Sequence, residues 1–75
     1  MSPSVEIYIK LLDEGVDVWR PVLAEFLHDD IYSIIDQPYD RETEIWEFEP
    51  GDEVVCEVID LYEGRTLAAT HRHSS

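Results

Sequence analysis

Cysteine, glycine and basic residues are scarce in this 75-residue chain, which has one cysteine, three glycines and five lysines or arginines. A single cysteine forms no disulfide within the chain, and such a chain is typical of a reducing compartment. Three scattered glycines do not build a glycine-rich phosphate-binding loop. No segment approaches the roughly 18 consecutive apolar residues of a membrane-spanning helix, and the start MSPSVEIYIK lacks the basic flank of a signal peptide. We therefore expect a cytoplasmic protein without membrane contact.

The scarcity of basic residues leaves a large excess of negative charge. Eighteen acidic residues stand against five basic ones, for a formal net charge of −13 with neutral histidines. Such a charge repels nucleic-acid phosphates and anionic lipids, and it favours either a basic partner or simply high solubility. Direct binding of nucleic acid is therefore not expected.

The length and hydrophobicity of the chain predict one small folded domain over residues 1–75. A chain of this length lies near the lower size limit for folding without disulfides or metals. Its apolar content of 44% is nevertheless too high for a disordered protein. We expect a monomer or a weak dimer.

Alternation of apolar and polar residues predicts strands in the first half of the chain. Val5, Ile7, Ile9 and Leu11 alternate with polar residues, as in a half-buried strand. A turn follows, in which we expect Gly15 to take a positive φ.

The next segment, residues 18–35, fits two structures. A helix over residues 21–35 would place Pro21 at its first position and would carry an apolar stripe. Two strands joined by a turn at residues 28–30 fit better, because β-branched and aromatic residues are frequent and turn signals closely spaced. Pro21 would then lie on a sheet edge or at a bulge. In this second structure one face of the first strand carries Val18, Arg20, Val22, Ala24 and Phe26.

The second half predicts a long loop over residues 36–43 and a short strand over residues 44–48. In that strand Trp46 and Phe48 share one face, which we expect in the core. Pro50 and Gly51 fit a type II turn, with a positive φ at Gly51.

A strand over residues 53–62 follows, with Val54, Cys56 and Val58 on one face, then a strand over residues 66–70 and a frayed tail over residues 71–75. Five or six short strands separated by turns predict an all-β, small SH3-like antiparallel barrel. The helical alternative for residues 21–35 would make the fold α+β instead.

Three stretches carry a resemblance to a known family: LLDEGVDVWRPV (residues 11–22), IYSII (residues 31–35) and WEFEPGDEVVCE (residues 46–57). Together they resemble a family of short bacterial proteins of unassigned function, over about two thirds of the chain. The resemblance implies an SH3-like β fold and a small accessory protein, and it implies no catalytic residues. Relatives carry glycine where this chain has HDD at residues 28–30.

The chain offers little for catalysis. Cys56 lies in an apolar strand beside Glu57, and a neighbouring carboxylate raises a thiol pKa instead of activating the thiol. His71 and His73 lie in the expected tail, and Glu47 and Glu49 would need a dry pocket to work as an acid–base pair. We expect no enzyme activity, no cofactor and no metal site.

Acidic and aromatic residues together predict a binding role instead. Residues 36–53 contain eight acids against one base, Arg41. Carboxylates around exposed aromatics suit a basic protein or peptide through charge-assisted hydrogen bonds and cation–π contacts. Trp19 and Pro21 would face away from the core and form a second contact surface, although Trp19 could equally be buried. The candidate binding residues are Trp19, Arg20, Tyr39, Asp40, Glu42, Glu44, Glu47 and Glu49.

A nucleic-acid mimic is the alternative function. Carboxylates at every second strand residue lie about 6–7 Å apart, close to the phosphate repeat of one DNA strand. Glu42 with Glu44, and Glu47 with Glu49, have this spacing. The protein would then inhibit a nucleic-acid-binding complex or a CRISPR-type defence complex. A continuous acidic stripe would indicate mimicry, whereas an aromatic groove rimmed by acids would indicate peptide binding.

Overall fold

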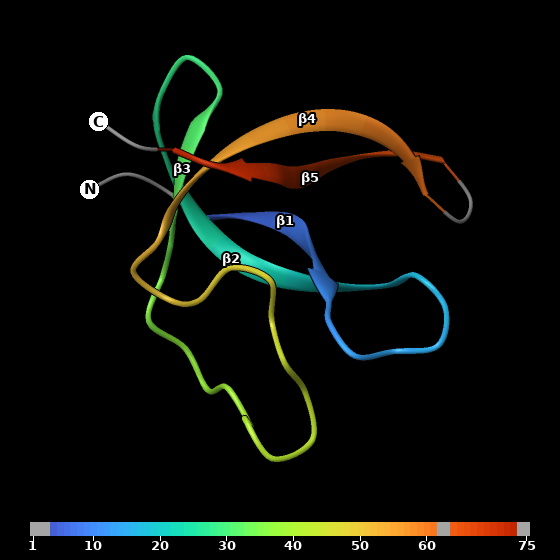
Figure 1. The fold of residues 1–75 in the computed structure, drawn as a ribbon. Helices are drawn as coiled ribbons and strands as arrows, with labels where there is room; N and C mark the ends of the chain where they lie inside the picture. Colours follow the sequence, from blue (N-terminus) through green and yellow to red (C-terminus); the bar gives the residue numbers. More distant parts are fainter. Residues whose placement is uncertain (1–3, 62–63, 74–75) are drawn as a thin grey trace.

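The computed structural model describes residues 4–61 and 64–73, and within them it contains five strands and no helix (Figure 1). The two-strand interpretation of residues 18–35 is therefore confirmed, and the helix over residues 21–35 is not formed. The strands are β1 (Ser4–Leu11), β2 (Val18–His28), β3 (Ile31–Ile34), β4 (Glu53–Leu61) and β5 (Gly64–Arg72).

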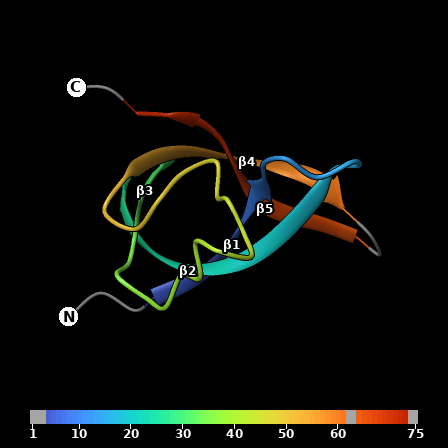
Figure 2. The ribbon, with the colours of Figure 1, turned by 60° about the horizontal axis from the view of Figure 1, so that its bottom comes forward.

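The five strands form a closed barrel in the order β1-β2-β3-β4-β5 (Figure 2). Successive strands pair antiparallel. One parallel pair, Tyr8 with Ala68, joins β5 back to β1 and closes the barrel. The predicted all-β barrel, consistent with an SH3-like fold, is confirmed with five strands, although its closing pair is parallel.

The core follows the alternation in β1 and β2. Ile7 and Ile9 are fully buried from β1, and Val22 and Ala24 are buried from β2. Arg20 and Phe26, expected on the same face of β2 as Val22 and Ala24, are exposed. Only the central part of β2 thus contributes fully buried side chains to the core.

Pro21 lies on an open edge of β2, as predicted. The main-chain N–H and C=O of Leu23 both form hydrogen bonds with residues after β3, so they point away from β1. Main-chain groups of alternate strand residues point the same way, so the nitrogen of Pro21 also points away from β1. The missing N–H of Pro21 therefore costs no hydrogen bond in the β1–β2 ladder.

Two of the turns use aspartate where glycine would be the easier residue. Asp13 has a φ of 60°, whereas Gly15 has no positive φ, so the prediction for Gly15 is wrong. Asp29 has a φ of 50° in the β2–β3 turn, and aspartate is among the few residues that adopt this region readily. Gly51 has the expected positive φ of 96°, and Asp52 N–H donates to the Glu49 carbonyl 2.9 Å away.

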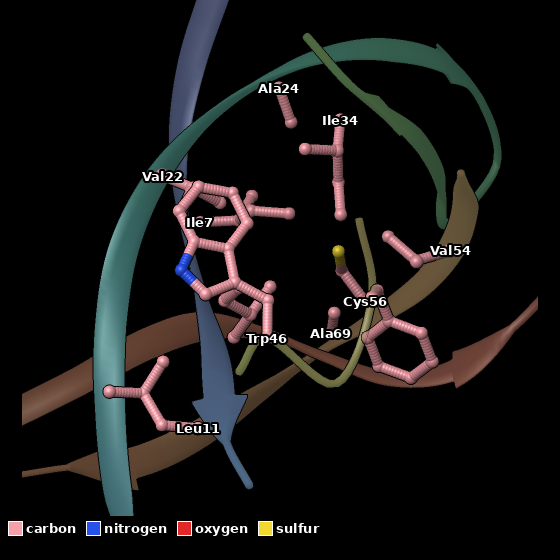
Figure 3. Packing of buried hydrophobic residues seen from close by; sticks show 11 residues of the cluster. Ile7, Leu11, Val22, Ala24, Ile34, Trp46, Val54, Cys56 and Ala69 are labelled. Atoms are coloured by element: carbon pink, nitrogen blue, oxygen red, sulfur yellow. The ribbon is translucent and has the colours of Figure 1, made fainter. Parts of the chain in front are cut away.

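Residues 35–52, between β3 and β4, contain no strand, so the predicted strand over residues 44–48 is wrong. A single bridge pairs Trp46 with Leu11 at the end of β1. The side chains of Trp46 and Phe48 are buried as expected, and Trp46 lies beside Ile7 and Val22 (Figure 3). We call residues 35–52 the acidic loop; it passes below the barrel in Figure 1. The loop places the Trp46 side chain in the core.

The parts of β4 and β5 nearest their connection form a two-stranded arm, because residues 58–61 and 64–67 pair only with each other. Val58, predicted on the same strand face as Val54 and Cys56, is 62% exposed on this arm, whereas Val54 and Cys56 are buried. His71 and Arg72 belong to β5, so the tail does not begin at residue 71 as predicted. Tyr62, Ser74 and Ser75, which were part of these predictions, lie outside the described residues.

Candidate functional site

Every lysine and arginine of the chain is paired with a carboxylate of the same chain. Each of the five cations takes one carboxylate, so the formal charge of −13 is carried by the remaining acids. The surface therefore presents negative charge that no lysine or arginine of the protein offsets. The five pairs are Lys10–Asp17 (3.1 Å), Arg20–Glu44 (3.2 Å), Arg41–Glu49 (3.4 Å), Arg65–Asp60 (3.8 Å) and Arg72–Asp52 (3.0 Å).

An aromatic stack orders the acidic loop, and Arg20 of β2 connects the loop to the barrel. The rings of Tyr39 and Trp46 stack with centroids 4.2 Å apart, and the Tyr39 hydroxyl accepts a 2.7 Å hydrogen bond from the Trp46 main-chain N–H. Arg41 lies over the Tyr39 ring at 4.5 Å, and Arg20 lies 5.9 Å from the centroid of Trp46. Glu44 connects β2 with the buried tryptophan, because its carboxylate pairs with Arg20 and accepts a hydrogen bond from the Trp46 indole N–H at 3.1 Å.

Two polar side chains shape the rest of the loop. The Gln37 amide accepts from the Leu23 N–H and donates to the Leu23 and Ile35 carbonyls, so it occupies the edge of β2 as a strand residue would. The Asp40 carboxylate accepts from the Glu42 N–H at 3.0 Å, and its carbonyl accepts from the N–H groups of Thr43 and Glu44. Asp40, predicted to bind a partner, thus organises a turn.

The predicted acidic residues divide into two groups. Glu44 and Glu49 are engaged with Arg20 and Arg41. Glu42 and Glu47 form no ion pair with any residue in the described part of the chain, and Glu42 is exposed. These two carboxylates are the ones in the predicted set that remain open to a partner.

The spacing on which nucleic-acid mimicry depends is absent from this loop. Glu42 lies in a turn, and neither Glu47 nor Glu49 lies in a strand. The regular strand repeat of carboxylates predicted there therefore does not form, and the mimicry hypothesis loses its geometric basis at these residues.

The remaining predicted residues are half-buried or already paired within the chain. Trp19 is half-buried in β2, opposite Lys10 of β1. Tyr39, expected as an exposed contact, is half-buried against Trp46. Arg20 is committed to Glu44, so it is not a free donor for a partner.

The lone thiol is a core group. Cys56 is buried, and its N–H donates to the Asp30 carbonyl at 2.8 Å. Burial, with a smaller effect from the charge of Asp30, raises the pKa of Cys56 from 9.0 to about 12. The carboxylate that contributes is thus Asp30 and not the neighbouring Glu57. Among residues 4–61 and 64–73, no group of three or more His, Cys, Asp or Glu side chains lies close enough together to hold a metal ion.

Residues outside the predicted set also matter for the surface. Leu12 and Ile45 are exposed side by side, because the Leu12 N–H donates to the Ile45 carbonyl at 2.7 Å. The contact depends on the bridge between Leu11 and Trp46, which are far apart in sequence. No local pattern in the sequence indicates such a pairing.

Comparison of the chain with protein-family models, with curated proteins and with solved structures gives no match. The resemblance to a family of short bacterial proteins therefore stays a prediction. Among the described residues, no helix has the length and apolar character needed to cross a membrane.

Replacing Tyr39 by phenylalanine tests the aromatic stack. The Trp46 N–H would lose its partner in a part-buried position, so we expect the Tyr39→Phe variant to lose about 1–2 kcal/mol of unfolding free energy in urea titrations. Tyr8→Phe is the matched control, because the Tyr8 hydroxyl forms no side-chain hydrogen bond in the part of the chain that the structure describes. Equal stability of the two variants would contradict the role of the Tyr39 hydroxyl.

The raised pKa of Cys56 makes stability depend on alkaline pH. The folded state keeps the thiol protonated, whereas the unfolded chain releases the proton above its ordinary pKa of 9.0. The stabilising contribution is therefore complete below pH 9.0 and is lost progressively as the pH rises toward about 12. We expect the unfolding free energy of the wild type to fall faster over this range than that of Cys56→Ala. Parallel pH curves would show that the thiol does not titrate in this way.

Proposed function

We propose that the chain is a non-enzymatic interaction module that binds a basic protein partner through its acidic surface. The observation that carries the proposal is the pairing of all five lysines and arginines within the chain, which leaves the remaining carboxylates without a basic counterpart. A partner that carries lysine or arginine would form ion pairs with these carboxylates. Opposite charge also accelerates the encounter of the two proteins and makes it sensitive to salt.

The acidic loop supports the proposal because it is held in one conformation. Trp46 is buried in the core, and Tyr39, Glu44 and Gln37 fix the chain on either side of it. Carboxylates on a pre-ordered loop lose less conformational entropy on binding than carboxylates on a mobile one. We assign partner contact to Glu42 and Glu47, the carboxylates of the predicted binding set that form neither an ion pair nor a turn hydrogen bond within the described residues; Asp36 of the same loop is likewise exposed and without an ion pair.

Two variants of equal charge test this assignment. The protein is first used to capture a basic partner from the cells that contain it, at low salt, and the partner is then purified. Glu42→Gln with Glu47→Gln removes two negative charges from the acidic loop. We expect this variant to bind the purified partner about three- to tenfold more weakly, as is usual for two contacts at the rim of an interface.

The control removes two charges elsewhere. Asp29→Asn changes the β2–β3 turn, where asparagine also accepts the positive φ, and Asp60→Asn changes the arm of β4 and β5. We expect this variant to bind within about twofold of the wild type, because the screened charges lie away from the contact. Equal losses in the two variants would show that only net charge matters, and the absence of any basic partner would refute the proposal.

A further inference from the structure

A row of apolar side chains lies on the outer surface of β1 and β2. The side chains of Ile7, Ile9 and Val22 point into the core, so their neighbours along each strand point outward. On β1 the outward residues include Tyr8, which lies directly opposite Pro21 of β2. Trp19, Pro21 and Leu23 follow one another at alternate positions along the outer face of β2.

The acidic loop extends this row beyond β1. Leu11 and Trp46 form a bridge and both are buried, so the next residues, Leu12 and Ile45, face outward. Leu12 is 40% exposed and Ile45 is 44% exposed, and Leu23 at the other end of the row is 46% exposed. We call this row the outer β1–β2 face; it comprises Tyr8, Leu12, Trp19, Pro21, Leu23 and Ile45.

Single exposed apolar residues are common on soluble proteins, but several of them gathered on one face are typical of an interaction surface. Acidic residues border this row. Glu6 lies opposite Leu23, and Glu47 lies beside Lys10, whose carbonyl accepts the Glu47 N–H at 3.0 Å. Lys10 is the one cation on these outward positions, and Asp17 pairs with it.

The edge of β2 beside this row is open. Main-chain groups of Trp19 and Pro21 point away from β1, as those of Leu23 do, and β3 pairs only from Ala24 onward. Within residues 4–61 and 64–73, no second strand pairs with residues 19–21, so the Trp19 N–H and the Trp19 and Pro21 carbonyls, which point away from β1, have no strand partner. Three main-chain groups are therefore available to an extended segment that lies along the row.

The negative charge of the protein indicates which kind of molecule binds this face. A second copy of the chain would carry the same −13 and be repelled, and an anionic membrane would be repelled as well. We propose that the outer β1–β2 face binds an extended segment of the basic partner, in which arginine or lysine alternates with bulky apolar residues. Alternate side chains of an extended segment point to opposite faces, so the apolar side chains pack together on Trp19 and Leu23. The long basic side chains at the two ends of the segment reach Glu6, opposite Leu23, and Glu47, beside Lys10. This inference rests on the proposed function; it assigns to the outer β1–β2 face the recognition of the partner's apolar residues.

Two synthetic peptides test the proposal with the full chain. The first is Arg-Val-Arg-Leu-Arg-Val-Arg, and the second has serine in place of valine and leucine, so that both carry the same charge. Titration is followed by NMR of the isotope-labelled protein at low salt. We expect the apolar peptide to bind at least about tenfold more tightly, because burial of its side chains adds to the charge attraction. It should shift the signals of Tyr8, Leu23 and the Trp19 indole.

A variant of the face and a matched control complete the experiment. Leu12→Ser with Leu23→Ser changes two exposed side chains, and we expect it to bind the apolar peptide no more tightly than the serine peptide. Val58→Ser changes an exposed apolar side chain on β4, and we expect the full tenfold preference to remain. Circular dichroism verifies that both variants are folded.

Other results would overturn the proposal in distinguishable ways. Equal affinity for both peptides, with no effect of the face variant, would refute the role of the outer β1–β2 face and leave the acidic interaction module intact. Binding of neither peptide would count against the proposed function as well. Self-association that the face variant abolishes would show that a second copy is the occupant.

Discussion

The fold depends on the insertion of Trp46 from a loop into a barrel made by five short strands. A chain of 75 residues has a small core, and the other buried side chains among the described residues are aliphatic, apart from Phe48 of the same loop and the thiol of Cys56. A buried aromatic contributes more apolar area than any aliphatic residue, so these two positions are a large share of the core. The acidic loop is therefore part of the folded unit, although it contains no strand.

The insertion of Trp46 also determines where charges lie. The indole N–H must find an acceptor when the ring is buried, and Glu44 supplies it. Glu44 in turn pairs with Arg20, and the Trp46 main-chain N–H is satisfied by Tyr39. These contacts use polar groups that the sequence suggests as free ligands. Of the carboxylates predicted to bind a partner, Glu42 and Glu47 are the two that remain open.

One bridge connects the core to the proposed binding surface. Pairing of Trp46 with Leu11 turns Leu12 and Ile45 outward and brings them together. The same pairing places Glu47 beside β1. The burial of one aromatic residue thus helps to build an apolar row with acidic borders on the opposite side of the sheet. This arrangement suits a partner that combines basic and apolar residues better than one that is only basic.

The strands could largely be predicted from the sequence, because alternation is a local signal. The period of two in residues 5–11 and the apolar pairs of β2 and β4 predict the inward residues correctly near the barrel centre. Alternation does not tell where a strand leaves the barrel: Val58 has the same place in the pattern as Val54 and Cys56, yet it lies exposed on the arm. The residue with positive φ in the first turn was also missed, since Asp13 takes the place expected for Gly15.

The candidate site was harder to predict, because its contacts join residues far apart in sequence. A strand over residues 44–48 has the right composition, yet the segment forms a single bridge and otherwise follows the side chains of Tyr39 and Glu44. Composition indicates that residues 36–53 are acidic, but not which carboxylates are used internally. That distinction requires the position of each arginine, which only the three-dimensional structure supplies.

Native-state hydrogen exchange tests most directly whether the acidic loop is one unit with the barrel. The amide of Leu12 donates to Ile45, and the amide of Glu47 donates to the Lys10 carbonyl, so both bonds break if the loop leaves the barrel. We expect these two amides to exchange with the same opening free energy as the amide of buried Ile9, because all three open only on global unfolding. Rapid exchange of Leu12 and Glu47 beside a protected Ile9 would show that the loop opens independently, and it would contradict the account.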